Sequence, residues 1–588
     1  MTSANDLLAA LSANPAAILF AGAGLGAFIP NGFASLRRPL MLLFLAASAF
    51  QLHRLGLGNY GQLTIFGEPV TMVRLDAMAR LFAIVFHIAA ALNIIYAWRS
   101  RDRLQDFASL AYPAAALGGV LAGDLVTLFV WWEIAAITSV FLIWGPGARA
   151  NFVSGMRYLT IQVLSGVLLL AGLALVWRET GSLAFGEIGL RDASGAIKPS
   201  GLVMLLAFGI KAAFPLLHNW VQDAYPKASF AGTIVLSVFT TKLAVASLAR
   251  GFPGTQELVV IGAVMTIFPI FFALIENDLR KVLSYSINNQ VGFMVIGIGF
   301  GTAASINGAV GYAFTNIIFE SLLFMAVGAA VYRTGTSKAT ELGGLYRTMP
   351  ATMVFCLIGA LSISAFPGFA GFVTKGLIID AAGEANAFVI WLVLLFASAG
   401  VLEHAGIKIP YFTFFAHDSG KRPREAPPEM LLAMGISACL CIAIGVYPAP
   451  LYALMPFPEA IAGYHPYAAY HVVEQLQLLV WAVIAFAALI VFRLYPAEVA
   501  SINLDTDWFA RVPGRALLGW ANAAAGAVWR LGWRAGTARL RASVHRIYAL
   551  NGPEGALARS WPIGFMALAT AIVLGAALLI AFAASAFY

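Results

Sequence analysis

The sequence predicts an all-α polytopic membrane protein, because the chain is very apolar and its apolar runs have the length of membrane spans. Of its 588 residues, 61% are hydrophobic and 11% are charged, and its mean hydropathy of +0.84 is far above that of soluble domains. About 20 apolar residues cross a bilayer core of about 30 Å, and about 14 to 16 such helices are expected. The candidate runs are approximately residues 14–33, 39–56, 77–98, 107–122, 125–144, 156–177, 201–220, 231–250, 257–275, 282–301, 305–332, 350–381, 386–415, 429–448, 474–492 and 562–586.

The orientation of these helices follows from Lys and Arg in the short loops. Arg37 and Arg38 follow the first run, three arginines follow the third, and Lys421 to Arg424 follow the thirteenth, so all of them fall on one side, which we expect to be cytoplasmic. The loop 447–477, on the other side, has no Lys or Arg. Both termini would then face away from the cytoplasm, and the first run would be a retained helix. This charge bias explains the net charge of +8 without nucleic acid as a partner.

Several classes of site are not indicated. Cys356, Cys439 and Cys441 lie in apolar runs and are expected to be small core residues. No CxxC set, no paired-helix histidine ligands and no Gly-rich nucleotide loop are present. We therefore predict no metal and no cofactor, and the chain has no catalytic motif of its own, which leaves open whether it belongs to an enzyme.

The segment 495–560 has a different composition, with arginines among Trp508, Trp520, Trp529 and Trp533. It suits an amphipathic helix in the cytoplasmic membrane interface. Some 40 helical residues would reach about 60 Å, although Pro513 and the glycines 514, 519, 526, 532 and 536 predict breaks. A basic anchor on anionic lipid and a strap against a neighbouring subunit are equally compatible with this pattern.

Ionisable residues inside apolar runs are the strongest functional signal, since a charge at the bilayer centre is costly. The runs contain Glu133, Lys211, Lys242, Glu320, Lys375, Glu403, His404 and Lys408, and His218 follows Lys211 in the segment KAAFPLLHNW. Each could instead hold helices together or be a neutral hydrogen-bonded acid. For Glu133, Lys211 and Lys375 taken together, a functional role is the stronger interpretation.

Two of these lysines lie beside predicted helix breaks. Pro215 stands four residues after Lys211, so the carbonyl of Lys211 loses its usual helix partner. Ser364, Pro367, Gly368 and Gly371 precede Lys375 and should divide that span into two half-helices. Irregular backbone at membrane depth needs protein or water around it, and paired broken helices are typical of transport sites. A row of lysines and acids can pass protons by changing partners.

Several of these segments resemble the antiporter-like membrane subunits shared by respiratory complex I, membrane-bound hydrogenases and Mrp-type cation/proton antiporters. The segments are the WWE of run 125–144, GMRYLTIQ, KAAFPLLHNWVQDAYPKAS, TTKLAVASLAR, ENDLRKVLSYSINNQVGF and FPGFAGFVTKGLII. The resemblance is closest to the D-type component of Mrp antiporters, which also has a counterpart of HAGIKIPYFTFF.

The resemblance implies two inverted five-helix repeats, each with one broken helix, and a proton path along the membrane midplane. It implies that Glu133 and Lys211 are an acid and its partner, that Lys242 links the repeats, and that Lys375 is the exit-side base. The expected organisation is N-terminal helices at 1–105, repeats at 106–252 and 253–418, further helices at 419–494, the amphipathic segment at 495–560 and a last membrane helix at 561–588.

The sequence departs from the family in run 305–332, where it reads NIIFESLLF instead of a pattern like HALFKALLF. Asn316 and Glu320 thus replace bases. Either Glu320 takes over by pairing with Lys375 or Lys408, or the second half-channel is altered or silent. Glu403, His404, Lys408 and Glu320 are treated as one cluster.

The leading hypothesis is a proton-translocating subunit of a multisubunit complex in the bacterial inner membrane, an Mrp-like monovalent cation/proton antiporter, with other membrane subunits as partners. The membrane arm of a redox-driven pump and an ion-driven inorganic carbon uptake subunit are alternatives. A quinone- or cluster-binding redox subunit and a purely structural subunit are further classes. Protons are the expected ion. Sodium is the second candidate, for which Glu133, Asp124, Ser364 and Thr374 offer oxygens without a motif.

Overall fold

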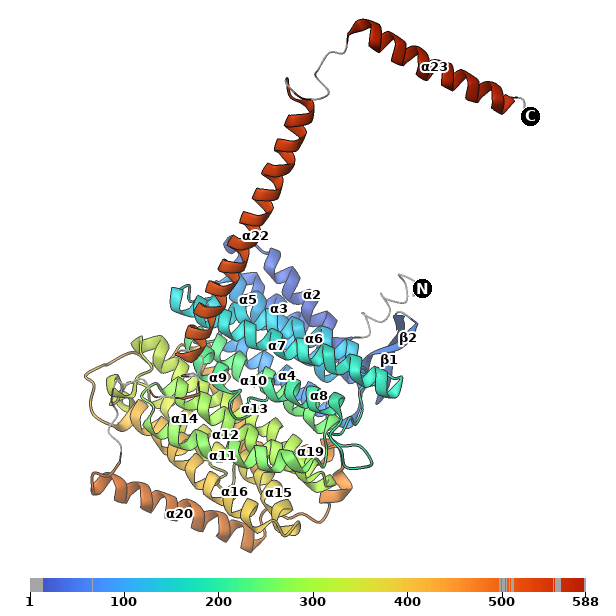
Figure 1. Ribbon diagram of the computed structural model, residues 1–588. Helices are drawn as coiled ribbons and strands as arrows, with labels where there is room; N and C mark the ends of the chain where they lie inside the picture. The colour runs from blue at the N-terminus through green and yellow to red at the C-terminus, as the bar shows by residue number, and fades with distance from the viewer. Residues whose placement is uncertain are drawn as a thin grey trace. The chain divides into compact units, whose positions relative to one another are not determined.

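The computed structural model describes residues 14–65, 67–495, 499, 503, 505, 506, 508, 512–553, 555 and 562–585. The chain divides into two compact units, residues 1–503 and 504–588. Each predicted apolar run lies on one helix or on consecutive helices (Figure 1). By length and composition, 11 helices of the described residues could each cross a membrane.

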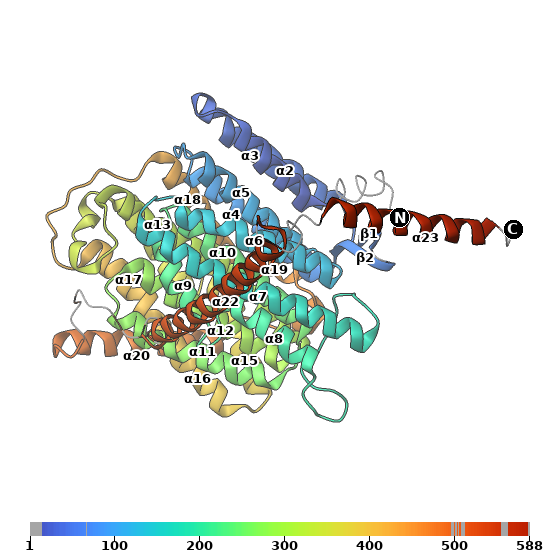
Figure 2. The same ribbon diagram turned by 45° about the horizontal axis from the view of Figure 1, so that its top comes forward.

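The first unit begins with a helical pair and a small hairpin. The elements are α2 (Pro15–Phe28), η1 (Asn31–Phe33), α3 (Ala34–Arg54), β1 (Gly58–Ile65), β2 (Glu68–Leu75) and α4 (Ala77–Tyr96). Helices α2 and α3 pack together at one edge of the bundle, against α5 (Arg103–Val120) (Figure 2). The hairpin was not predicted. Its antiparallel register pairs Gly58 with Leu75. Val70, Val73 and Leu75 of β2 are buried, but strands this short give no membrane signal in the sequence.

Two successive series of five spans form the centre of this unit. The first is α5, α6 (Leu125–Trp144), α7 (Arg149–Thr180), the pair α8 (Pro199–Lys211) and α9 (Asn219–Ala224) with η2 (Tyr225–Lys227), and α10 (Gly232–Gly251). The second is α11 (Gln256–Ile275), α12 (Leu279–Phe300), α13 (Ala303–Thr334), the pair α14 (Pro350–Ile363) and α15 (Ala370–Glu384), and α16 (Phe388–Val401) with η5 (Leu402–Ile407), α17 (Lys408–Pro410) and η6 (Tyr411–Phe415). Because each series has an odd number of spans, the second starts on the opposite side and is inverted.

The fourth span of each series is broken where the sequence predicts it. Helix α8 ends at Lys211, and Ala213 and Leu216 in the break have positive φ values of 61° and 70°. Helix α14 ends at Ile363, and Ala365 has a φ of 56°. Alanine and leucine rarely adopt this backbone region, so tertiary packing holds both breaks. Trp220 supports the first by donating from Nε1 to the carbonyl of Ile210 at 2.9 Å.

The two series pack around α10, α12 and α13. Every residue of α10 is buried, and α13 is buried from Ser305 to Ala330. The unit is completed by the turns η3 (Ala339–Glu341) and η4 (Leu345–Arg347) and by α18 (Pro428–Val446), α19 (Ala449–Leu454), η7 (Pro458–Ile461) and α20 (Ala469–Val491). Charged side chains on α10 and α13 are therefore enclosed by protein and kept away from lipid.

The second unit contains two helices, α22 (Pro513–Asn551) and α23 (Ile563–Ser585). The predicted breaks within 513–551 are wrong, since α22 is one helix of 39 residues, about 58 Å long. Pro513 occupies the first turn, where its missing N–H costs nothing, and an isolated glycine weakens a helix by only about 1 kcal/mol. Trp529 and Trp533 stack with ring centroids 6.3 Å apart and line an apolar face together with Leu540.

Candidate functional site

Glu133 and Lys211 lie close together at the first broken helix without forming an ion pair. The Lys211 side chain is fully buried. Its Nζ donates to the carbonyl of Trp132 at 2.7 Å and lies 4.3 Å from the centroid of the Trp132 ring. Glu133, the next residue on α6, is half-buried, and its Oε1 has no hydrogen-bond partner among the described residues. The lysine thus binds the backbone beside the acid and leaves the carboxylate available.

Gly166 of α7 faces Glu133. Sequence reasoning did not single out this glycine. A Cβ atom built on Gly166 would overlap the Oε1 atom of Glu133. Only a glycine therefore leaves room for the carboxylate in this orientation. The segment between Gln162 and Gly166 reads QVLSG, and its small residues on a helix next to a buried acid were the signal available in the sequence.

Lys242 and Glu320 form a buried ion pair that joins the two series. Lys242 Nζ of α10 lies 2.9 Å from Glu320 Oε2 of α13, and the side chains are 0% and 2% exposed. The same Nζ donates to the carbonyl of Ser237 at 3.0 Å. The expectation that Glu320 pairs with Lys375 or Lys408 is therefore wrong, because α13 turns this acid toward α10.

Lys375 lies on α15, the second half of the second broken span, and its Nζ has no hydrogen-bond partner among the described residues. The side chain is 1% exposed, and Nζ lies 4.3 Å from the centroid of the Phe293 ring. A cation over an aromatic face gains some stabilisation, but no carboxylate of the described part of the chain is in contact to neutralise it. Lys375 thus resembles Lys211, since both are buried in a broken span and both rest on an aromatic ring.

A small cavity of about 30 Å³ leads from Lys375 to Asp380, His471 and Glu474, which sequence reasoning missed. It has room for about two waters, at about 10 to 15 Å³ each. His471 Nε2 of α20 lies 3.6 Å from Asp380 Oδ2 of α15. Two acids and a histidine near the loop 447–477, which has no Lys or Arg, were the available signal.

Glu403 and His404 of the predicted cluster lie in the π-helical segment η5, and Lys408 is the first residue of α17. Glu403 is half-buried, and His404 is buried with Nδ1 2.6 Å from the carbonyl oxygen of Gly400. Lys408 Nζ donates to three carbonyls at the end of α11, those of Ala273, Leu274 and Glu276, at 3.2, 2.6 and 2.8 Å. Three free carbonyls at a helix C-terminus are a favourable site for a cation, so Lys408 caps α11.

His218 lies at the first break, immediately before α9. Its ring is buried and packs against Phe268 of α11 with the ring centroids 4.5 Å apart. It therefore reaches from the broken helix of the first series to the first helix of the second.

Uncharged polar side chains fill the space between these charged groups. Asn288, Asn289 and Gln290 of α12 are fully buried. Gln222 of α9 donates from Nε2 to Oδ1 of Asn288 at 3.3 Å, and the Tyr312 hydroxyl donates to Oε1 of Gln290. Buried amide side chains inside a membrane span are expected to be hydrogen-bonded to protein or to water.

Comparison with known proteins gives the family of this membrane core. Residues 122–401 match the family described as NADH:quinone oxidoreductase/Mrp antiporter, TM. One relative, the D component of the Na(+)/H(+) antiporter of Alkalihalophilus pseudofirmus, is 29% identical over 387 residues, which are 62% of this chain and 77% of that one.

Two solved structures have the same fold. A chain of the Mrp complex from Dietzia has a TM-score of 0.67 at 22% identity, with 80% of this chain and 99% of that one covered. A chain of the membrane-bound sulfane sulfur reductase, an archaeal respiratory membrane complex, has a TM-score of 0.66 at 22% identity, with coverage of 97% and 99%.

The fold and the buried charges define a multi-pass helical membrane protein of the ion-translocating type. Within that class, the chain is similar over residues 122–401 to the antiporter-like membrane subunits of the superfamily that contains the Mrp antiporters and complex I. The resemblance inferred from the sequence motifs is confirmed.

Proposed function

We propose that this chain is the proton-translocating subunit of a multisubunit complex in the bacterial inner membrane, of the Mrp-like monovalent cation/proton antiporter kind. The observation that carries the proposal is the buried Lys242–Glu320 pair. It lies between two buried lysines, Lys211 and Lys375, that contact no carboxylate of the described residues. A buried ammonium is stabilised by a nearby carboxylate and loses its proton more readily without one.

The exchange of carboxylate partners supplies a route for protons. When Glu133 approaches Lys211, that lysine is stabilised in its charged form, and when Glu133 withdraws, the proton can leave. A change of charge on Lys211 then alters the field at the Lys242–Glu320 pair, and Lys375 is the next base along the series. The polar side chains of α12 and the cavity at Asp380 supply hydrogen-bonding positions between and beyond these groups.

The two five-helix series correspond to residues 106–252 and 253–418 in this proposal, followed by helices at 419–494, an amphipathic segment at 495–560 and a last membrane helix at 561–588. In this proposal the cytoplasm lies on the side of the loop arginines Arg99 and Arg101; Arg37 and Arg38, which the sequence also suggested as loop residues, lie buried on α3. The relatives named above are subunits of larger membrane assemblies, which supports membrane subunits as the partners of this chain.

The test of transport uses everted membrane vesicles that contain the whole complex and a pH-sensitive dye. We expect Lys211→Ala to abolish the proton movement coupled to Na+ or K+ and Lys338→Ala to leave it unchanged, because Lys338 is an exposed residue paired with Glu341. Equal transport by Lys211→Ala and the wild type would remove this lysine from the path and overturn the proposal.

The test of the assembly is a mild-detergent purification of the tagged chain followed by mass spectrometry of the proteins that accompany it. Small hydrophobic subunits and a second antiporter-like chain are the expected partners. Iron–sulfur or hydrogenase-like proteins would assign the same relay to a redox-driven pump, and one large soluble partner would assign it to ion-driven carbon uptake.

A further inference from the structure

A second cavity, of about 290 Å³, has none of the buried charges Glu133, Lys211, Lys242, Glu320 and Lys375 in its lining. It is bounded by α3, the end of α4, the start of α5, the end of α6 and the start of α10. Its polar lining includes Arg38, Asn93, Ser109 and Ser229, and its apolar lining includes Leu142 and Phe230. A water needs only about 10 to 15 Å³, so the cavity has the size of a small ligand.

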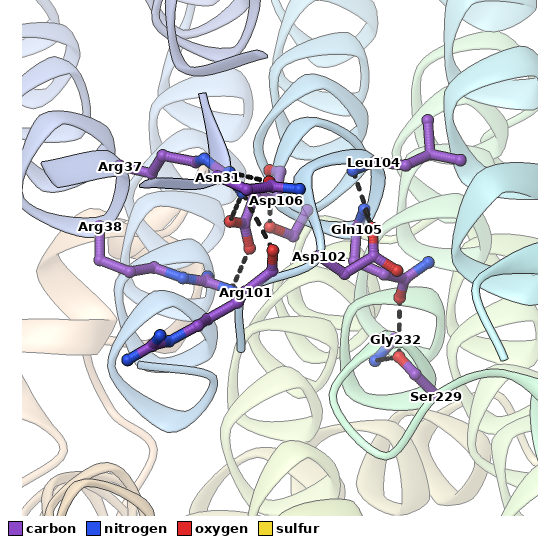
Figure 3. Close-up of polar contacts among 11 residues, drawn as sticks. Asn31, Arg37, Arg38, Arg101, Asp102, Leu104, Gln105, Asp106, Ser229 and Gly232 are labelled. Carbon is purple, nitrogen blue, oxygen red and sulfur yellow. Dashed lines mark hydrogen bonds and ion pairs between the residues drawn. The ribbon is translucent and has the colours of Figure 1, made fainter. Parts of the chain in front are cut away.

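Arg38 of the cavity lining shares the carboxylate of Asp106 with a second buried arginine, Arg37 (Figure 3). Arg37 and Arg38 are 0% and 3% exposed, and Asp106 is 3% exposed. Arg37 Nη1 lies 3.1 Å from Asp106 Oδ2, and Arg38 Nη2 contacts Asp106 Oδ1. Two guanidinium groups with one carboxylate leave an excess positive charge in a buried place, and an uncompensated buried charge is costly.

The two arginines differ in how their remaining donors are used. Arg37 also donates to the carbonyl of Arg101 at 3.3 Å and to the side chain of Asn31. Arg38 Nε and Nη1 have no hydrogen-bond partner among the described residues, and the same holds for both amide atoms of Asn93. Arg37 Nε also lacks a partner among the described residues, but Arg37 is not part of the cavity lining, so the free guanidinium donors at the cavity are those of Arg38.

The other charged residue of the lining does not neutralise Arg38. Asp102 is exposed, and its Oδ1 accepts from the backbone N–H groups of Leu104 and Gln105 at 2.9 and 3.2 Å as the cap of α5 (Figure 3). The N-terminus of α10 at Gly232 also lines the cavity, and the positive end of a helix dipole favours an anion.

We propose that this cavity binds a phosphate-bearing anion and that Arg38 is its principal ligand. The planar guanidinium can donate two parallel hydrogen bonds to phosphate oxygens. Asn93 supplies a further donor, and the α10 N-terminus contributes the positive end of its dipole, since its Gly232 N–H already donates to Ser229 Oγ. The apolar side chains Leu142 and Phe230 would contact the glycerol or acyl part of a phospholipid. The same phosphate chemistry could come from an anionic lipid headgroup or from free phosphate, and the experiment separates the two.

The experiment uses the full chain, purified and delipidated in detergent. Native mass spectrometry follows binding of added phosphatidylglycerol, and calorimetry follows binding of inorganic phosphate. The variants are Arg38→Gln, Ala97→Met, which fills the cavity without touching the arginine pair, and the control Arg103→Gln, which removes an exposed charge at the start of α5. A lost charge-assisted hydrogen bond weakens binding about tenfold or more.

We expect one phosphatidylglycerol to bind the wild type and Arg103→Gln, and to bind Arg38→Gln and Ala97→Met at least about tenfold more weakly. Binding of inorganic phosphate alone with the same dependence on Arg38 would support the site and assign it to free phosphate. Equal binding by Arg38→Gln and the wild type, or binding of neither probe by the wild type, would overturn the proposal. Should Arg38→Gln not fold, undiminished binding by Ala97→Met would overturn it as well.

Discussion

At the residue scale, variants of the Lys242–Glu320 pair can distinguish a role of the pair in helix packing from a role in proton transfer. Removal of one partner of a buried ion pair leaves an uncompensated charge and costs about 3 to 5 kcal/mol, whereas replacement of both by apolar residues is often neutral or stabilising. We expect Lys242→Ala to lower the melting temperature in detergent and the double variant Lys242→Met/Glu320→Leu to restore it.

The same double variant should remain inactive in proton transport, because it has neither a base nor an acid at the junction of the two series. Transport by each variant is measured in the vesicle assay, and its melting temperature is measured in detergent for comparison. If the double variant regained both stability and transport, the pair would only hold α10 against α13.

A second residue-scale prediction concerns the cavity that leads from Lys375. Asp380→Asn removes the acid next to His471 but preserves the shape of the side chain. We expect proton transport to fall at least about tenfold with little change in melting temperature, since proton transfer by a positioned side chain contributes about 10²- to 10⁴-fold. The matched control is Glu459→Gln, which changes an exposed acid of the loop 447–477 that does not line this cavity. Equal transport by both variants would exclude Asp380 from the path.

At the element scale, the fit of α7 against α6 depends on one glycine. Gly166→Ala would place a Cβ atom in the space taken by the Glu133 carboxylate. We expect a loss of transport comparable to that of Glu133→Gln, because the carboxylate must leave its place beside the Lys211 site. The control is Gly186→Ala, where an added Cβ meets nothing within 4 Å, and normal transport by Gly166→Ala would contradict the role given to this contact.

The long helix α22 gives a prediction that concerns stability alone. Gly519 and Gly526 are interior positions of this helix, and an added Cβ meets nothing within 4 Å at either. Replacing each with alanine should stabilise the helix by about 1 kcal/mol. Hydrogen exchange of the backbone amides of residues 513–551 in the full chain should slow accordingly. Unchanged exchange would mean that the tertiary environment of α22, not its own propensity, sets its stability.

At the scale of the whole molecule, much of the architecture could be predicted because membrane spans are long and strongly apolar. The two helix breaks were also predictable, since Pro215 and the Pro367–Gly368 pair stand in spans that each hold a buried lysine. The hairpin 58–75 was missed, because short strands without a regular apolar alternation resemble loops in an otherwise helical chain. The continuity of α22 was missed because proline and glycine in a sequence do not reveal whether a helix tolerates them.

The composition and the positions of the buried charges alone determined that this is a polytopic membrane protein with lysines beside two broken helices. A charge inside an apolar run is costly wherever the run packs, so the sequence identifies it directly. Only the tertiary structure decided which charges meet. Glu320 pairs with Lys242, Lys408 caps α11, and Arg38 keeps free donors beside a cavity, because the rotation and contacts of each helix depend on neighbours distant in the chain.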